Sequence, residues 1–190
     1  MMYTTDSKIR VEADARREFE ALYRRSHKRA YNLAYRLLGN AAEAEDVTQE
    51  AYFRAWRNFA RYDRAYSFEA WLYRILTNLA SDCRRRKRRV AIYSLDTRFG
   101  LDPDGLSGAL EIADDSANPE TLLCDHNFSE PLARALAALP DGHRTAVLLA
   151  DVAECSYDEI AQIMQCPVGT VRSRIHRGRL MLRRSLKRGP

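Results

Sequence analysis

The chain has 190 residues, of which 46% are hydrophobic and 30% charged, and its formal net charge is +5. This length suits one ordinary domain or two small ones, and the basic balance favours an anionic partner. No apolar run approaches the roughly 20 residues that cross a bilayer, and the polar N-terminus offers no secretory signal, so we expect a cytoplasmic protein without membrane insertion.

The N-terminal part of the chain predicts three helices. Apolar residues at spacings of three and four indicate the first helix over residues 14–38. Asn40 caps a second helix over about 41–59, whose acids come early and whose arginines come late, as the helix dipole favours. Ser67 caps the third helix, which carries apolar side chains on one face and runs into six consecutive basic residues, 84–89.

The charge changes sign after this basic run. Residues 94–125 hold eight carboxylates and one arginine, and they include several Gly, Pro and Ser residues. Such a stretch rarely buries enough apolar surface to order itself. We therefore predict an all-α protein with two small helical domains, 1–91 and 128–190, joined by a flexible acidic linker over 92–127.

The C-terminal domain predicts a helix-turn-helix. Two helices are expected over 129–139 and 143–152. Ser156 and Glu159 have capping-box spacing and open a short helix, and a Pro-Val-Gly break then precedes a longer basic helix. In this motif the second helix enters the DNA major groove. Residues 166–190 carry eight Lys and Arg and no acid, which disfavours the alternative of a solvated amphipathic hairpin.

The cysteines do not form a recognisable metal motif. Cys83, Cys124, Cys155 and Cys166 include no C-x-x-C pair, so free thiols are expected. A zinc site built on Cys124 and His126 with distant partners is an alternative. No Gly-rich phosphate loop is present either, and the sequence predicts no metal, no cofactor and no catalytic residue.

Three segments resemble, in chain order, motifs of the extracytoplasmic-function sigma factors of bacterial RNA polymerase. Residues 156–164 read Ser-Tyr-Asp-Glu-Ile-Ala-Gln-Ile-Met and residues 166–175 read Cys-Pro-Val-Gly-Thr-Val-Arg-Ser-Arg-Ile, similar to the family's promoter-binding helix-turn-helix. Residues 44–57 resemble its polymerase-binding helix, and residues 68–78 resemble its helix for the promoter −10 element. The resemblance implies sigma region 2 in the first domain and sigma region 4 in the second.

The resemblance implies a polymerase-binding face on the second helix. Asp46, Gln49, Glu50 and Phe53 fall at i, i+3, i+4 and i+7 and therefore share a face. The implied partner is the pair of clamp helices of the polymerase's largest subunit, with the β-subunit flap as a further contact. The alternative is a solvated face with Phe53 turned inward.

Contacts to the −10 element are implied for the third helix and the turn before it. Asn78 offers a base edge both a donor and an acceptor, and the resemblance implies that it and the turn 61–67 hold a flipped base. Tyr62, Tyr66 and Trp71 are the available aromatics, of which Trp71 is interpreted rather as a core residue, and the basic run would follow the phosphates. The candidate −10 residues are Arg61, Tyr62, Tyr66, Arg74, Asn78, Arg85, Lys87 and Arg88.

Contacts to the −35 element are implied for the last helix, where arginine can pair with guanine edges and neutralise phosphates. The candidates are Thr170, Arg172, Ser173, Arg174, His176 and Arg177. Two residues depart from the family pattern. Cys155 stands where glycine is common, and Gly178 stands where alanine is usual, at a cost of about 1 kcal/mol in a helix interior.

The sequence therefore predicts a sigma factor, not an enzyme, that directs core RNA polymerase to promoter DNA through −10 and −35 elements. The resemblance implies that the linker threads the polymerase cleft toward the RNA exit channel, whereas its composition alone indicates a spacer. An anti-sigma factor that occludes both domains is a further implied partner. Two alternatives stay open: a stand-alone helix-turn-helix regulator that needs no polymerase, and an RNA-binding or scaffold protein indifferent to promoter sequence.

Overall fold

The computed structural model describes residues 3–99 and 129–187, and all regular elements in these two ranges are helical. The first range holds α1 (Tyr3–Leu38), α2 (Ala41–Arg57), the short 3₁₀ helix η1 (Phe59–Arg61) and α3 (Phe68–Phe99). The second range holds α4 (Glu130–Ala138), α5 (Asp141–Asp151), α6 (Tyr157–Met164) and α7 (Val168–Lys187). The predicted all-α fold is confirmed. Every helix in these two ranges is too short or too polar to span a bilayer.

The helix starts that the sequence predicts are present. The Asn40 side chain accepts the backbone N–H of Glu43 at 3.0 Å and caps α2. At α6, Ser156 Oγ accepts the N–H of Glu159 at 3.3 Å, and the Glu159 carboxylate accepts the N–H of Ser156 at 2.9 Å. This reciprocal pair is the predicted capping box, and it fixes where the chain enters the helix-turn-helix.

Several helix ends differ from the prediction. The first helix begins at Tyr3, and α3 continues to Phe99, eight residues past the predicted domain boundary, because neither Gly nor Pro interrupts the chain before Gly100. Asp141 opens α5, two residues earlier than expected. Asp141 and Gly142 can occupy the first turn of the helix, because the backbone N–H groups of that turn have no intrahelical partner. The rest of the predicted linker lies outside the described residues.

The first helical bundle packs α1, α2 and α3 around an aromatic cluster. Phe19 of α1 lies with its ring centroid 5.1 Å from that of Phe59 and 5.9 Å from that of Phe68. Tyr52 of α2 is buried beside them, and its hydroxyl shares a hydrogen bond of 2.6 Å with Ser26 of α1. Each large apolar side chain buried in this way contributes roughly 1.5–3 kcal/mol.

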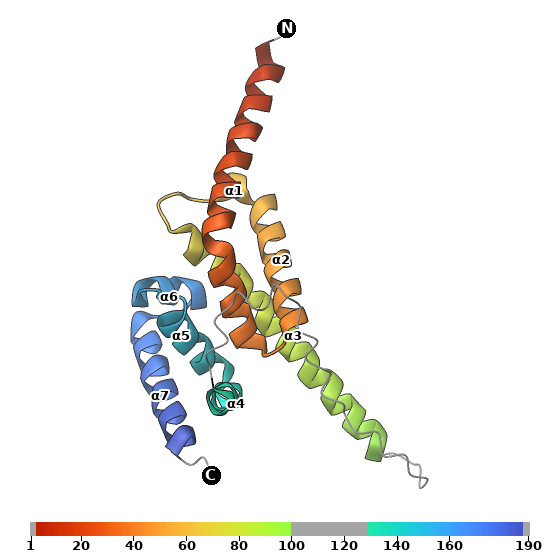
Figure 1. Cartoon of the computed structure of the whole chain (residues 1–190), viewed down its shortest axis with the longest axis vertical. Helices are drawn as coiled ribbons and strands as arrows, with labels where there is room; N and C mark the ends of the chain where they lie inside the picture. Colours follow the sequence, from red (N-terminus) through yellow and green to blue (C-terminus); the bar gives the residue numbers. More distant parts are fainter. Residues whose placement is uncertain (1–2, 100–128, 188–190) are drawn as a thin grey trace.

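The second bundle packs α4 to α7, and it does not stand apart from the first. Figure 1 shows α5 and α6 lying against the lower part of α1 and the first half of α3, while the N-terminal half of α1 and the far end of α3 project beyond the bundles. Buried apolar side chains of both bundles form one continuous cluster. The described part of the chain is therefore a closed arrangement of two helical units.

Candidate polymerase-binding and nucleic-acid interfaces

The predicted polymerase-binding face lies open on α2. Asp46 and Gln49 are exposed, Glu50 is half-buried, and the Phe53 side chain is 55% exposed. The alternative in which Phe53 turns inward is therefore wrong. The Arg57 guanidinium lies 5.6 Å from the Phe53 ring centroid, which is cation–π range. This face offers an apolar anchor beside carboxylates, the composition that suits docking against a basic helix.

The turn between η1 and α3 has a fixed shape. The Tyr62 hydroxyl donates to the Tyr66 carbonyl at 2.7 Å, and the Tyr62 ring stacks on Trp71 with centroids 5.2 Å apart. Arg64 reaches back to α1, where its Nε and Nη2 donate to the Glu18 carboxylate at 2.9 and 2.6 Å. The Arg64 hydrogen bond holds the pKa of Glu18 below its ordinary value. The turn is thus attached to α3 through the Tyr62–Trp71 stacking and to α1 through the Arg64–Glu18 hydrogen bonds.

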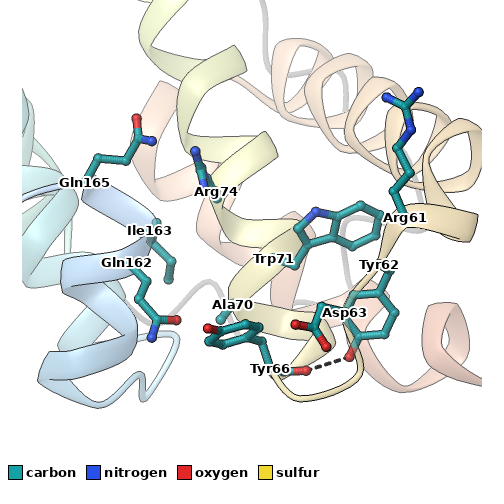
Figure 2. Close-up of a pocket in the computed structure, with 10 residues that line it drawn as sticks. All are labelled: Arg61, Tyr62, Asp63, Tyr66, Ala70, Trp71, Arg74, Gln162, Ile163 and Gln165. Atoms are coloured by element: carbon teal, nitrogen blue, oxygen red, sulfur yellow. Dashed lines mark hydrogen bonds between the residues drawn. The ribbon is translucent and has the colours of Figure 1, made fainter.

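Two hollows flank Trp71. One, of about 430 Å³, has a wall of α6 residues and a wall formed by α3 and its preceding turn (Figure 2), which includes the predicted −10 residues Arg61, Tyr62, Tyr66 and Arg74. The other, of about 390 Å³, is lined by Asn78 and again by Arg61 and Trp71. Most of the predicted −10 residues therefore gather around one tryptophan.

Trp71 is not the core residue that the sequence predicts, because the structure places it at the surface of the core. It is half-buried and packs against that core while lining both hollows. The sequence offers Trp71 as an available aromatic but favours a core position, because a tryptophan on the third helix fits an apolar stripe as well as a binding hollow. The nearby Tyr62 and Tyr66 are the available indication of an aromatic surface.

The basic run is largely paired with acids. Arg85 lies 3.2 Å from Asp82, and Lys87 Nζ lies 2.6 Å from the Glu43 carboxylate. Arg88 pairs at 2.9 Å with the carboxylate of Asp141 in the second bundle, and Arg84 pairs with the same carboxylate. The run is therefore not a uniformly solvated cationic stripe in this arrangement.

The predicted −35 residues divide into two groups on α7. Arg172, Ser173, His176 and Arg177 are exposed. Thr170 and Arg174 are half-buried, and Arg174 Nη1 lies 3.6 Å from the Cys166 sulfur and its guanidinium packs over Gly142 at the start of α5. Four of the six candidates thus share an open face, while Arg174 lies between α7 and its own bundle.

The described cysteines are free thiols. Cys83, Cys155 and Cys166 are each half-buried, and burial raises the pKa of Cys155 to about 12. Within residues 3–99 and 129–187, no group of three or more His, Cys, Asp or Glu side chains is placed to hold a metal ion. The alternative zinc site on Cys124 and His126 lies outside the described ranges.

Comparison with known families matches both bundles. Residues 22–90 match the family model "Sigma-70 region 2", and residues 129–182 match "Sigma-70, region 4". The ECF RNA polymerase sigma factor SigW of Bacillus subtilis is 41% identical over 157 residues, which cover 83% of this chain and 82% of SigW. The ECF RNA polymerase sigma-E factor of Escherichia coli is 33% identical over 170 residues, covering 90% of this chain and 87% of that protein.

One longer relative and two solved structures agree. SigE of Mycolicibacterium smegmatis is 41% identical, and the match covers 87% of this chain but 60% of that protein. The sigma factor RpoE of Bartonella quintana, solved with the anti-sigma factor NepR, superposes with a TM-score of 0.65 at 26% identity, covering 91% of this chain and 99% of that one. CnrH, solved with the cytosolic domain of CnrY, has the same TM-score at 22% identity and shares the fold. The chain belongs to the ECF sigma factors, the promoter-specific initiation factors of RNA polymerase.

Proposed function

We propose that the two bundles divide the work of promoter recognition. The region 2 domain, residues 1–91, binds core polymerase through the open face of α2 and the −10 element through the surface around Trp71. The region 4 domain, residues 128–190, binds the −35 element through the exposed side of α7. Residues 92–127 connect them, and RNA synthesis itself belongs to the polymerase, so the chain is not an enzyme and acts in the cytoplasm.

The observation that carries this proposal is the arrangement around Trp71. Two hollows with aromatic, amide and guanidinium linings meet there. A base taken out of the DNA stack needs aromatic surface on which to stack and amide groups that satisfy its edge. Asn78 supplies the amide, and Tyr66, which is 53% exposed, supplies aromatic surface at the rim.

Two further partners follow from the family. RpoE of Bartonella quintana was solved with an anti-sigma factor, and we propose that an anti-sigma factor also binds this chain. The polymerase contacts are the clamp helices of the largest subunit for α2 and the β-subunit flap for region 4. The stand-alone regulator would have no use for the open, apolar-acidic face of α2, and the scaffold alternative would have none for the hollow lined by Asn78.

Run-off transcription tests the proposal directly. Core polymerase from a bacterium, with and without the chain, is supplied with randomised promoter templates, and discrete products that need the chain are expected. Asn78→Ala should reduce these products while leaving co-elution with core polymerase unchanged. Absence of products together with absence of co-elution would contradict the proposal and favour the stand-alone regulator.

A further inference from the structure

One carboxylate of region 4 pairs with two arginines of region 2. Asp141, the first residue of α5, accepts hydrogen bonds from Arg84 and, at 2.9 Å, from Arg88. The two arginines are four residues apart on α3 and therefore share a face. The Arg84 side chain is only 11% exposed, so this contact is shielded from water on one side. Both arginines belong to the basic run that would otherwise face DNA phosphates.

A buried arginine reinforces the same contact. Arg144, one turn after Asp141, is 6% exposed, and its Nη1 donates to the Leu37 carbonyl of α1 at 3.4 Å. Its Nη2 donates to the carbonyls of Ala137 and, at 3.2 Å, Leu139, at the corner between α4 and α5. One guanidinium thus joins the end of α1 to the region 4 domain.

A second anchor lies at the other end of the interface. The Ser67 hydroxyl, just before α3, donates to the Glu159 carboxylate of α6 at 3.0 Å. Between the two anchors, Gln162 and Ile163 of α6 and Gln165, which caps the end of α6, form the wall of the larger hollow opposite α3 (Figure 2). Region 4 therefore forms one wall of the larger hollow in the surface proposed to hold the −10 element, whereas the hollow at Asn78 has no lining residue from region 4.

This arrangement is incompatible with simultaneous binding of both promoter elements. The −10 and −35 elements lie about 25 base pairs apart, which is roughly 85 Å of duplex at about 3.4 Å per base pair. In the closed chain α6, which directly precedes α7, touches α3. The 100–128 segment between the two described ranges is long enough to reach roughly 100 Å when fully extended. The covalent chain thus permits the separation that the closed contacts prevent.

We propose that Asp141 serves as an internal substitute for a DNA phosphate on Arg84 and Arg88, so that region 4 is a built-in cover for the larger hollow and part of the basic run in the −10 surface of the free protein. This inference rests on the proposed function of that surface. A carboxylate and a phosphate present the same anionic oxygens to a guanidinium, so DNA and Asp141 compete for the same donors.

The cover is built so that it can open. Arg84, Arg88 and Arg144 gather around the single carboxylate of Asp141, and burial together with Arg84 lowers the pKa of Arg144 to about 10. Among the described residues the Arg144 Nε finds no hydrogen-bond partner. Three like charges around one acid repel one another, and the Arg88 side chain is 63% exposed, so the contact is open to salt and to competing anions.

Trp71 can report the opening. The chain has two tryptophans, and Trp56→Phe leaves Trp71 as the single fluorophore. In this background Asp141→Asn removes the charge but keeps the side-chain size, and Asp151→Asn is the matched control. Asp151 also lies on α5 but pairs with Arg179 inside region 4. Each variant is measured for acrylamide quenching of Trp71 and for affinity to a fluorescein-labelled, random-sequence single-stranded DNA. A length of about 20 nucleotides exceeds the roughly 4–16 nucleotides that a single-strand-binding domain occupies.

We expect Asp141→Asn to increase quenching and to tighten DNA binding roughly fivefold to tenfold relative to Asp151→Asn, because two arginines become available to phosphates. Asp141→Glu keeps the charge and should stay close to the unaltered chain, which separates loss of charge from local misfolding. Equal quenching in Asp141→Asn and Asp151→Asn overturns the cover. Increased quenching without tighter DNA binding overturns the competition with phosphate. Failure of the proposed function is seen separately, as absence of promoter-dependent transcripts from an opened chain.

Discussion

Gly178 of α7 lies so close to Val147 of α5 that a Cβ built on the glycine would come within 2.6 Å of the valine Cγ2. Real Cβ atoms do not approach other carbon atoms this closely, so any larger residue must push the two helices apart. Gly178 is buried for the same reason. The departure from the family's usual alanine is therefore a packing feature of this bundle, and the glycine allows α7 to approach α5.

We expect Gly178→Ala to lower the free energy of unfolding by about 1 kcal/mol. Overpacking costs roughly 1–3 kcal/mol, and the better helix propensity of alanine offsets about 1 kcal/mol of that cost. Urea denaturation monitored by circular dichroism measures the difference. Gly169→Ala is the control on the same helix, because a Cβ built on Gly169 would meet nothing within 4 Å, and it should stabilise the protein. Equal effects at the two glycines would contradict the packing explanation.

We expect Asp46→Ala combined with Phe53→Ala to abolish binding to core polymerase without unfolding region 2. Both side chains are exposed, so their removal leaves no cavity. An exposed aromatic at the centre of an interface is typical of residues that dominate binding energy. Gel filtration with core polymerase measures the association. Asp82→Ala with Val90→Ala removes an acid and an exposed apolar side chain from α3 instead and should still co-elute. If the α2 variant also co-elutes, this face does not bind polymerase.

We expect Arg172→Ala and Arg177→Ala each to weaken binding to −35-dependent promoters by about 1–3 kcal/mol, the usual value of a base contact. Both arginines lie on the exposed side of α7. Equilibrium binding of the polymerase complex to promoter and non-promoter duplexes separates the two kinds of contact. An equal loss on both duplexes would assign these arginines to phosphates. Arg174→Ala, in contrast, removes packing over Gly142 and should lower stability.

We expect acid to weaken the α6 capping box. Hydrogen bonds, first from the backbone N–H of Ser156 and then from the Ser156 and Ser67 hydroxyls, lower the pKa of Glu159 below its ordinary value of 4.5. A carboxyl group with a lowered folded-state pKa stabilises the fold above its unfolded pKa, and this contribution is lost as the pH falls through the folded value. The stability advantage of the unaltered chain over Glu159→Gln should be about 1 kcal/mol at pH 7 and should shrink below pH 4.5. An advantage that is independent of pH would exclude ionised Glu159 as its source.

The local features of this chain could be predicted from sequence because they depend on neighbours along the chain. The caps at Asn40 and Ser156 follow from residue types three positions apart, and both are confirmed. The exposed face of α7 follows from helical spacing in the same way. The extension of α3 to Phe99 is missed because a run of arginines resembles a helix tail, although no helix-breaking residue occurs within it.

The contacts between the bundles could not be predicted from sequence. Arg84 and Asp141 are 57 residues apart, and no local sequence pattern around either residue indicates that they pair. Arg144 reads as an exposed cation on an amphipathic helix, yet it is buried because three backbone carbonyls from α1 and the α4–α5 corner surround its guanidinium. Such placements depend on how two separately predictable units dock, which no local sequence pattern specifies.

The pairing of Arg84 and Arg88 with Asp141 also affects how much of the free protein binds non-specifically to chromosomal DNA. A chromosome offers an enormous excess of non-specific sites, and a chain with a formal charge of +5 is drawn to all of them. Neutralising two arginines internally removes phosphate contacts from each of those weak encounters. A larger share of the protein then remains in the unbound pool from which polymerase is recruited, and these two cations become available only after the two domains separate.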